Sequence, residues 1–442
     1  METNMKNKKK SDIDNDKTTK PSTSQSTSQC VDILKIASSI LKGYDLCDNC
    51  FGRQFAKLGT GLTNRQRGHA LKVSLSMQNN TPLPDITTLP EDCEICNGFF
   101  DDENLSMWAD RAIEATSGYE YNTFLAGTTI SGIIAENEEM VWEEFDPVFA
   151  EQTKTEINRE VGKCIMDKTE LDVNFKAPDI LFNFDIANDD LTVYSNSIYI
   201  LGRYRKLVRG IPQTRWPHRD CHGSGCEGCN FTGKQYPESV EELAIAPLVD
   251  MAQSDDAVMH GAGREDIDAL MLGTGRPFVI EAKQPRVRTI DLTTLKNRIN
   301  EEAEGKIEVT ELTLTERKTV EHIKGMHVDK TYIARVEFES GVTEETLLSA
   351  AKQLSGAVLS QRTPERVAHR RADLVRERRC HEMTVESWDG ANKKAILKFN
   401  CEGGTYIKEL VSGDDGRTVP SLAGILGVGA KVYELDVMGI DD

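Results

Sequence analysis

The spacing of apolar residues along the chain predicts both helices and strands. Apolar positions recur at helical intervals in residues 31–58, 64–77, 156–166 and 343–354. Residues 191–200, 307–314 and 332–338 alternate apolar and polar positions, which predicts strands, and further strands are expected near 382–388, 394–400, 404–409 and 431–438. A buried strand is expected within residues 123–135. The later part of the chain is therefore predicted to be an α+β domain with a largely antiparallel sheet.

This pattern is interrupted at two places, which predict domain boundaries. Residues 1–30 have no apolar periodicity and are rich in Lys, Ser, Thr and Gln, so they are expected to form a disordered tail. Residues 206–235 combine a basic linker with a Gly- and Cys-rich hairpin. We therefore expect one domain over residues 31–205 and a second over residues 236–442.

The tail lacks the apolar run of a signal peptide, and no later stretch is long and apolar enough to span a bilayer. The protein is accordingly expected to be soluble and cytoplasmic. The 11 cysteines cluster in C-x-x-C pairs, which in this compartment indicates thiols or metal ligands rather than disulfides.

The net charge of -19 argues against a generally basic nucleic-acid-binding protein, but its basic residues are concentrated in two segments. Leu201–Asp220 carries six Arg or Lys against one acid, and Gln361–Cys380 carries seven Arg against three acids. The arginines from 370 to 379 are compatible with a solvated helix face or with a surface that follows phosphates. RNA therefore remains a possible partner.

Residues 261–285 contain the strongest candidate for chemistry. Gly-Arg-Glu-Asp forms a predicted turn before an apolar run, and a second turn, Gly-Thr-Gly-Arg-Pro, is predicted before a strand-like segment. A neighbouring arginine favours the ionised form of a carboxylate, which makes Asp266 a candidate nucleophile. From these residues alone, a solvated turn or a helix cap is the commoner role of such an aspartate, and Asp268 is the local alternative.

Two clusters have the composition of metal sites. Two C-x-x-C pairs suit a closed tetrahedral zinc site, with four unrelated buried thiols as the alternative; these are Cys47, Cys50, Cys93 and Cys96. The second cluster is His218, Cys221, Cys226 and Cys229, in which His222 competes as the fourth ligand. Both would be structural, since water activation needs an open coordination position.

Several long motifs in order resemble the tRNA pseudouridine synthases of the Pus-ten family. They include CDNCFGRQF, GRYRKLVRGIPQTRWP, NFTGKQYPESVEEL, GREDIDALMLGTGRPF, DKTYIARV, QRTPERVAHRRAD and GGTYIKELVSGDDGRTVPSL, and the resemblance covers most of residues 45–442. It implies a pseudouridine synthase catalytic domain with a mixed, largely antiparallel sheet. It also implies an N-terminal, zinc-containing THUMP-like α/β accessory domain that binds tRNA, and isomerisation of uridines 54 and 55 in the T-loop.

The resemblance also implies roles for individual residues. Asp266 would be the catalytic aspartate, with Arg264 holding it ionised and in place. Tyr332 would stack on the flipped uracil and help in proton transfer, and Tyr406 would contact the substrate. Arg362 and Arg417 are weaker candidates for pairing with phosphate or carboxylate.

Isomerisation consumes no external reagent, in agreement with the absence of a P-loop, a dinucleotide fingerprint or a methyl-donor motif from the sequence. We therefore expect no organic cofactor, structural zinc, tRNA as the partner, no membrane and no obligate protein partner. The alternatives are another THUMP-containing tRNA-modifying enzyme, such as a methyltransferase or thiolation enzyme, and a non-enzymatic tRNA-binding protein.

Overall fold

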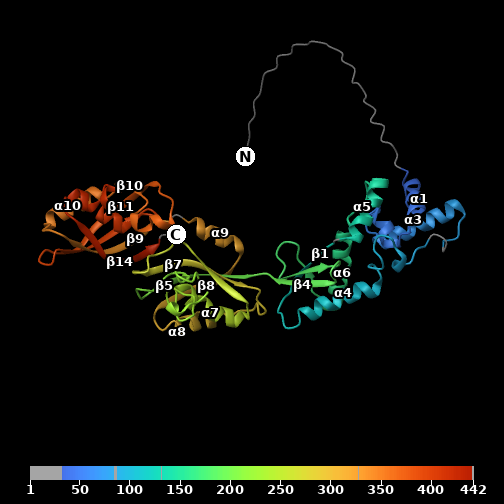
Figure 1. Ribbon diagram of the computed structural model, residues 1–442, viewed down its shortest axis with the longest axis horizontal. Coiled ribbons are helices and arrows are strands. Elements are labelled where there is room, and N and C mark those ends of the chain that lie inside the picture. The colour runs from blue at the N-terminus through green and yellow to red at the C-terminus, as the bar shows by residue number, and fades with distance from the viewer. Residues whose placement is uncertain (1–31, 84–86, 131, 327, 441–442) are drawn as a thin grey trace, which may run out of the picture. The chain divides into compact units, whose positions relative to one another are not determined.

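The computed structural model describes residues 32–83, 87–130, 132–326 and 328–440, which divide into two compact units (Figure 1). One unit contains the chain up to Gly98 together with Ile133–Glu151, and the other contains Phe99–Gly132 and the chain from Gln152 onwards. The domain expected at 31–205 thus contributes to both units, and its boundaries, like those of the hairpin segment, stay a prediction. The tail predicted at residues 1–30 lies outside the described residues. None of the described helices combines the length and apolarity needed to cross a membrane.

The first unit is helical. The single helix expected over 31–58 is two helices. The first, α1, ends at Gly43, and the second, α2, begins after its N-cap Cys47. Its helices are α1 (Ile33–Gly43), α2 (Asp48–Arg53), α3 (Asn64–Asn79) and α5 (Ile133–Phe145), with a 3-10 turn at Pro90–Asp92. Helices α2 and α3 meet backbone to backbone, since a Cβ on Gly52 would lie 1.9 Å from the carbonyl oxygen of Asn64.

The second unit contains a four-stranded sheet with the order β2-β1-β3-β4, in which β1 runs parallel to β2 and β3 and β4 runs antiparallel to β3. Phe124, Phe182 and Phe184 are fully buried in it, and helices α4 and α6 pack against the strands. The elements are α4 (Asp102–Ala115), β1 (Thr123–Thr129), α6 (Thr153–Thr169), β2 (Asp172–Val173), β3 (Ile180–Asp185) and β4 (Asp190–Ser195). The strand expected within 123–135 ends at Thr129, and Ile133 already begins α5.

The rest of the second unit is built on a ten-stranded sheet of order β13-β10-β11-β12-β9-β14-β7-β5-β8, with β6 paired to β7. All neighbours are antiparallel except β14 and β7, so the expected mixed, largely antiparallel sheet is confirmed. The strands are β5 (Ile198–Lys206), β6 (Asp256–Gly261), β7 (Ala269–Lys283), β8 (Ile307–Thr315), β9 (Lys330–Phe338), β10 (Val358–Arg362), β11 (Val375–Asp389), β12 (Lys394–Cys401), β13 (Thr418–Val419) and β14 (Ala430–Ile440).

Helices cover this sheet at both ends of the strand order. Figure 1 shows α7 and α8 beside β5 and β8, and α10 beside β10 and β11, in agreement with the contacts between these elements. The helices are α7 (Val240–Ala252), α8 (Leu292–Glu302), α9 (Arg317–Gly325), α10 (Glu344–Leu354), α11 (Ile407–Ser412) and α12 (Leu422–Leu426), with 3-10 turns at Glu227–Cys229, Glu365–Arg370 and Asp414–Gly416.

The turn predicted at Gly-Thr-Gly-Arg-Pro is wrong, because these residues lie inside the long strand β7. Before Gly273 the strand pairs with β14, and from Phe278 onwards it pairs with β6, whereas β5 pairs with it on both sides of the glycines. Both glycines have positive φ, and a Cβ on Gly273 would lie 1.7 Å from the carbonyl oxygen of Met438. The glycines therefore let one strand change partners instead of reversing direction.

Two further predictions in the C-terminal half are wrong. Residues 404–409 form a turn and the start of α11, because the side chain of Gln361 bonds both the backbone N–H and the carbonyl of Tyr406 and fixes the helix start. The arginines expected on a helix face lie partly on β11, where Arg376, Arg378 and Arg379 occupy a strand paired with β10.

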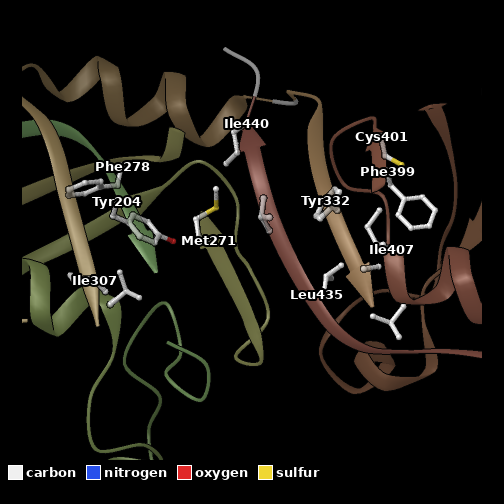
Figure 2. Close-up of a cluster of buried hydrophobic side chains, with 14 of the residues drawn as sticks. Tyr204, Met271, Phe278, Ile307, Tyr332, Phe399, Cys401, Ile407, Leu435 and Ile440 are labelled. Carbon is white, nitrogen blue, oxygen red and sulfur yellow. The ribbon is translucent and has the colours of Figure 1, made fainter. Parts of the chain in front are cut away.

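The apolar core of the ten-stranded sheet surrounds the middle strands. Figure 2 shows Tyr332 of β9 with Leu435 and Ile440 of β14 on one side and Phe399 and Cys401 of β12 on the other. The apolar face predicted for residues 332–338 is confirmed, since Tyr332, Ala334, Val336 and Phe338 are all buried.

Candidate active site

Asp266 lies in the loop that joins β6 to β7. Gly263 has φ 81°, so the loop turns at a residue without a Cβ. The carbonyl of Asp266 accepts a hydrogen bond from Ala269 N at 3.1 Å, where β7 begins. The side chain of Asp266 is 31% exposed, so a substrate can reach its carboxylate.

Two cations from distant segments contact this carboxylate. Arg366 Nη1 lies 3.0 Å from Asp266 Oδ2, and Lys408 Nζ lies 3.5 Å from the same oxygen. Arg366 comes from the 3-10 turn after β10, and Lys408 comes from α11. At these distances the two positive side chains attract the carboxylate and orient it.

Arg366 is itself held by a second carboxylate. Its Nε donates to Glu409 Oε1 at 2.6 Å, and the Glu409 side chain is only 5% exposed. Burial lowers the pKa of Arg366, but the bonds and charges of Glu409 and Asp266 outweigh it and keep that pKa above its ordinary value. The guanidinium is thus a fixed positive charge between two carboxylates.

Asp268, the local alternative, is more exposed and is paired with Lys408. The two Lys408–Asp268 hydrogen bonds measure 2.8 and 3.0 Å, and the Asp268 side chain is 64% exposed. Partial burial raises the pKa of Asp268, whereas the hydrogen bond and charge of Lys408 lower it more, so the net shift is downward.

Arg264 contacts an aromatic ring. Its guanidinium lies over the ring of Trp216, 4.9 Å from the centroid, in a cation–π arrangement. The cations that the structure places on the Asp266 carboxylate are Arg366 and Lys408. A direct role of Arg264 at that carboxylate stays a prediction.

The residue between Arg264 and Asp266 anchors the loop in the core. Glu265 accepts a bond of 2.9 Å from Arg276 Nε, and the two side chains are 0% and 1% exposed. The Tyr204 hydroxyl donates to the same carboxylate at 2.9 Å. Burial raises the pKa of Tyr204, so its proton is retained and remains available to Glu265.

The backbone of the loop is also bonded on both sides of Glu265. Gln213 Nε2 donates to the carbonyl of Gly263 at 2.9 Å and to Tyr204 Oη at 2.8 Å. Lys206 Nζ donates at 3.1 Å to the carbonyls of Asp266 and Ile267. Burial lowers the pKa of Lys206, which is fully enclosed. The loop is therefore rigidly placed while the Asp266 side chain stays accessible.

Tyr332 lies within electrostatic reach of this loop. Its burial raises its pKa; the charge of Arg276 acts in the opposite direction, and that of Asp266 adds to the rise. Lys330, two positions earlier on β9, is also largely buried, and burial together with the charge of Arg276 lowers its pKa to about 8.

The remaining predicted substrate residues lie around α11 and β10. Tyr406 is the N-cap of α11, two residues before Lys408. Arg362 forms an ion pair with Asp373, with Nε 2.9 Å from Oδ1. The carbonyl of Arg417 accepts a hydrogen bond from Arg362 N at 2.8 Å. The Nη1 atom of Arg417 is buried with no hydrogen-bond partner among the described residues.

The sequence did not identify Arg366, Lys408, Glu409 or Arg276 as site residues. Arg366 and Lys408 lie 100 and 142 positions after Asp266, and no local spacing connects residues so far apart. A usable signal was present, since each missing residue belongs to one of the motifs that carried the family resemblance.

The first cysteine cluster has the geometry of a metal site. Its four Sγ atoms lie within 4.8 Å of one another, and all four residues are buried. The Sγ atoms of Cys47 and Cys96 are 3.8 Å apart, which is about the edge of a tetrahedron with metal–sulfur bonds of ~2.3 Å. These residues could hold one metal ion.

The second cluster also has four residues and is more exposed. Cys226 and Cys229 have Sγ atoms 3.8 Å apart, and His218 Nδ1 lies 3.5 and 3.7 Å from the Sγ atoms of Cys226 and Cys221. These distances also fit a tetrahedron of three thiolates and one imidazole. His222, the competing ligand, is exposed and stands outside the cluster.

Two known protein families match most of the chain. The family described as "Pus10, C-terminal" matches residues 199–441, and the family described as "Pus10 THUMP domain, archaeal" matches residues 108–185. The first match includes the ten-stranded sheet, and the second includes β1 and β3.

Whole-length relatives agree with these matches. A protein of Methanothrix thermoacetophila named tRNA pseudouridine synthase Pus10 is 44% identical, covering 94% of this chain and 96% of its own. Proteins of the same name from Halorubrum lacusprofundi and Methanocaldococcus jannaschii are 44% and 40% identical, covering 93% and 91% of this chain and 97% and 93% of their own.

Proposed function

Because the chain belongs to the Pus10 family and is a tRNA pseudouridine synthase, we propose that it isomerises uridines 54 and 55 of the tRNA T-loop with Asp266 as nucleophile. The observation that carries the proposal is an accessible carboxylate contacted by two cations on a loop fixed from both sides. The enzyme is an isomerase.

The reaction rearranges bonds without adding or removing atoms. The N1–C1′ glycosidic bond breaks, the uracil turns, and a C5–C1′ bond forms while C5 loses a proton and N1 gains one. Because nothing external is consumed, the reaction requires no organic cofactor. An ionised aspartate supports it by attacking either the ribose or the base.

The residues around Asp266 supply what this nucleophile needs. Arg366 and Lys408 stabilise the carboxylate before attack and lie beside the charge that returns when the covalent intermediate breaks down. Glu265 and Arg276 keep the loop from moving, since breaking a buried ion pair is strongly unfavourable.

The target uridine has to leave the stacked T-loop before it reaches Asp266. Extrusion costs a few kcal/mol, which stacking on an aromatic ring offsets. We assign this stacking to Tyr332, whose burial raises its pKa and keeps its hydroxyl protonated. Tyr406 precedes Lys408 on α11 and is the second candidate for contact with the substrate.

The rest of the tRNA is bound by other parts of the chain. The THUMP domain is proposed to hold the tRNA, and Arg362 and Arg417 are proposed to pair with its phosphates. The Nη1 of Arg417 is buried without a hydrogen-bond partner in the described part of the chain, which supports a role in binding an anion. We propose that the protein acts in the cytoplasm and needs no obligate protein partner.

Zinc is proposed for both cysteine clusters. Cys47, Cys50, Cys93 and Cys96 would hold one ion, and His218 with Cys221, Cys226 and Cys229 would hold the other. With four protein ligands each, both sites would be structural and would stabilise the local fold.

The proposal is tested by incubating unmodified tRNA with the protein alone and mapping pseudouridine by carbodiimide primer extension. Modification at positions 54 and 55 is expected, and it should disappear in Asp266→Ala while tRNA binding is retained. Modification that survives in Asp266→Ala would exclude this residue as the nucleophile. Loss in Asp268→Ala alone would move the role to Asp268.

A further inference from the structure

The hairpin of residues 216–236, called here the cysteine hairpin, presents an aromatic ring to solvent. Its Phe231 is 74% exposed. The chain has 14 phenylalanines, and Phe175 is the other one that is exposed. An exposed aromatic ring on this hairpin offers a face on which a base can stack.

The backbone at this position does not favour phenylalanine. Asn230 has φ 50° and Phe231 has φ 60°, in the left-handed region that bulky residues rarely occupy. Glycine or asparagine would fit there with less strain. Strain of this kind persists where the surrounding structure enforces it, and it is common at binding sites.

The surrounding hairpin enforces the left-handed backbone conformation of Phe231. Phe231 N donates to the carbonyl of Cys226 at 2.8 Å. A Cβ on Gly225 would lie 2.8 Å from the carbonyl oxygen of Phe231, and one on Gly233 would lie 2.3 Å from that of Gly223. The turn is therefore packed backbone against backbone, which fixes the backbone conformation of Phe231 and leaves its side chain exposed.

Two exposed arginines belong to the same part of the chain. Arg215, just before the hairpin, and Arg219, within it, are exposed, and neither side chain has an ion pair among the described residues. Exposed aromatic rings next to free arginines are the composition of sites that stack on unpaired RNA bases and contact the adjacent phosphates.

The base of the cysteine hairpin contacts the loop that carries Asp266. Pro217 pairs with Lys234 across the hairpin, and the Trp216 ring packs against Tyr236 with centroids 5.6 Å apart. The same Trp216 ring lies under the guanidinium of Arg264. Phe231 is three residues from Lys234, which limits their separation to about 11 Å. An RNA whose uridine is at Asp266 therefore lies near the hairpin.

We propose that the cysteine hairpin is a second RNA-contact site, in which Phe231 stacks on an unpaired base of the tRNA outside the pocket for the target uridine. The inference rests on the proposed function, since it takes tRNA as the substrate. The ring supplies the stacking face, and Arg215 and Arg219 supply charge for the phosphates beside that base. The hairpin thereby orients the tRNA relative to Asp266.

The test compares two variants of the full chain, Phe231→Asn and Phe231→Tyr. Kd for an unmodified tRNA transcript is measured by fluorescence anisotropy, and the thermal unfolding midpoint is measured in parallel. Asn removes the ring and relaxes the backbone, so we expect Kd to rise on the order of 10-fold while the midpoint stays or rises. Tyr keeps the ring and should keep Kd within about twofold.

Three results would overturn the proposal: an unchanged Kd in Phe231→Asn, equal losses of affinity in both variants, or a lowered midpoint with metal loss in Phe231→Asn. In a second measurement, p-benzoylphenylalanine at position 231 is photo-crosslinked to tRNA. Capture of an unpaired nucleotide is expected, and capture within a base-paired stem or no capture contradicts it.

A failure of this inference can be told apart from a failure of the proposed function. Asp266→Ala should bind tRNA as tightly as the unchanged protein while its activity is lost. If that holds and Phe231→Asn also binds normally, only the role of Phe231 is excluded. If the unchanged protein neither binds nor modifies tRNA, the proposed function fails as well.

Discussion

At the scale of single residues, the site depends on charges brought together from three distant segments. Asp266, Arg366 and Lys408 meet at distances of 3.0–3.5 Å, and Glu409 holds Arg366 from its other side. Loss of a cationic partner should affect the two carboxylates differently, because Glu409 is buried and Asp266 is partly open to solvent.

Separate substitutions should distinguish the structural from the catalytic role of Arg366. Arg366→Met leaves the nearly buried Glu409 unpaired, which should lower the free energy of unfolding by about 3–5 kcal/mol. It should also lower the rate of pseudouridine formation about 100-fold. The double variant Arg366→Met, Glu409→Gln should regain most of the stability, measured by denaturant unfolding, but not the rate. Recovery of both would show that Arg366 acts only through the fold.

Lys330 provides a prediction of pH dependence. Its pKa is about 8 in the folded protein against 10.5 as the ordinary value, so the folded state disfavours its charge. This cost is fully present below pH 8 and is relieved as pH rises towards 10.5. Lys330→Met should therefore be more stable at pH 7 by on the order of 3 kcal/mol.

Urea unfolding of Lys330→Met and the unchanged protein at several pH values measures this effect. The difference in unfolding free energy should shrink between pH 8 and 10.5, as the unchanged protein loses the charge. A difference that stays constant over this range would show that Lys330 is not destabilised by its charge, and Lys330→Arg, which keeps a charge, serves as the matched control.

At the scale of elements, the sequence predicted what depends on local patterns. The alternation in residues 332–338 identified β9 and its buried face, and C-x-x-C spacing identified both groups of side chains that lie close enough to hold a metal ion. Residues 404–409 were misassigned because Gln361, 45 positions away, fixes the start of α11. The glycines of β7 were taken for a turn because the sequence does not show that Met438 lies against Gly273.

Measuring the metal content tests whether each of the two cysteine clusters binds a zinc ion. We expect two zinc ions per chain by elemental analysis and one in Cys96→Ser. That variant should also unfold more easily by several kcal/mol, since metal binding contributes directly to folding. Cys226→Ser should likewise retain one ion. Cys164, which lies outside both clusters, gives the control Cys164→Ser with two ions. Two ions in Cys96→Ser would contradict the assignment.

At the scale of the whole molecule, a net charge of -19 has to be reconciled with binding to a polyanion. The cations that contact Asp266 are local, on the 3-10 turn after β10 and on α11, whereas the acidic residues are spread over the chain. The net negative charge of the protein slows the approach of RNA, but the affinity depends on the local contacts.

The affinity for tRNA should therefore depend strongly on salt. A plot of log Kd against log salt concentration should rise with a slope of about 3 or more, because several phosphates are neutralised by Arg and Lys. Arg362→Gln should reduce the slope by about 1. Anisotropy titrations between low and physiological salt measure both values. A slope near zero would mean that phosphate contacts contribute little to binding.

The central claim is that Asp266 is the nucleophile of uridine isomerisation. It is tested most directly with tRNA carrying tritium at C5 of uridine, because forming the C5–C1′ bond releases that hydrogen to water. Asp266→Asn keeps the size of the side chain and removes its charge, and Asp268→Asn makes the same change two residues away. We predict no tritium release with Asp266→Asn and release within about 10-fold of the unchanged rate with Asp268→Asn. Release by Asp266→Asn at the unchanged rate would contradict the account.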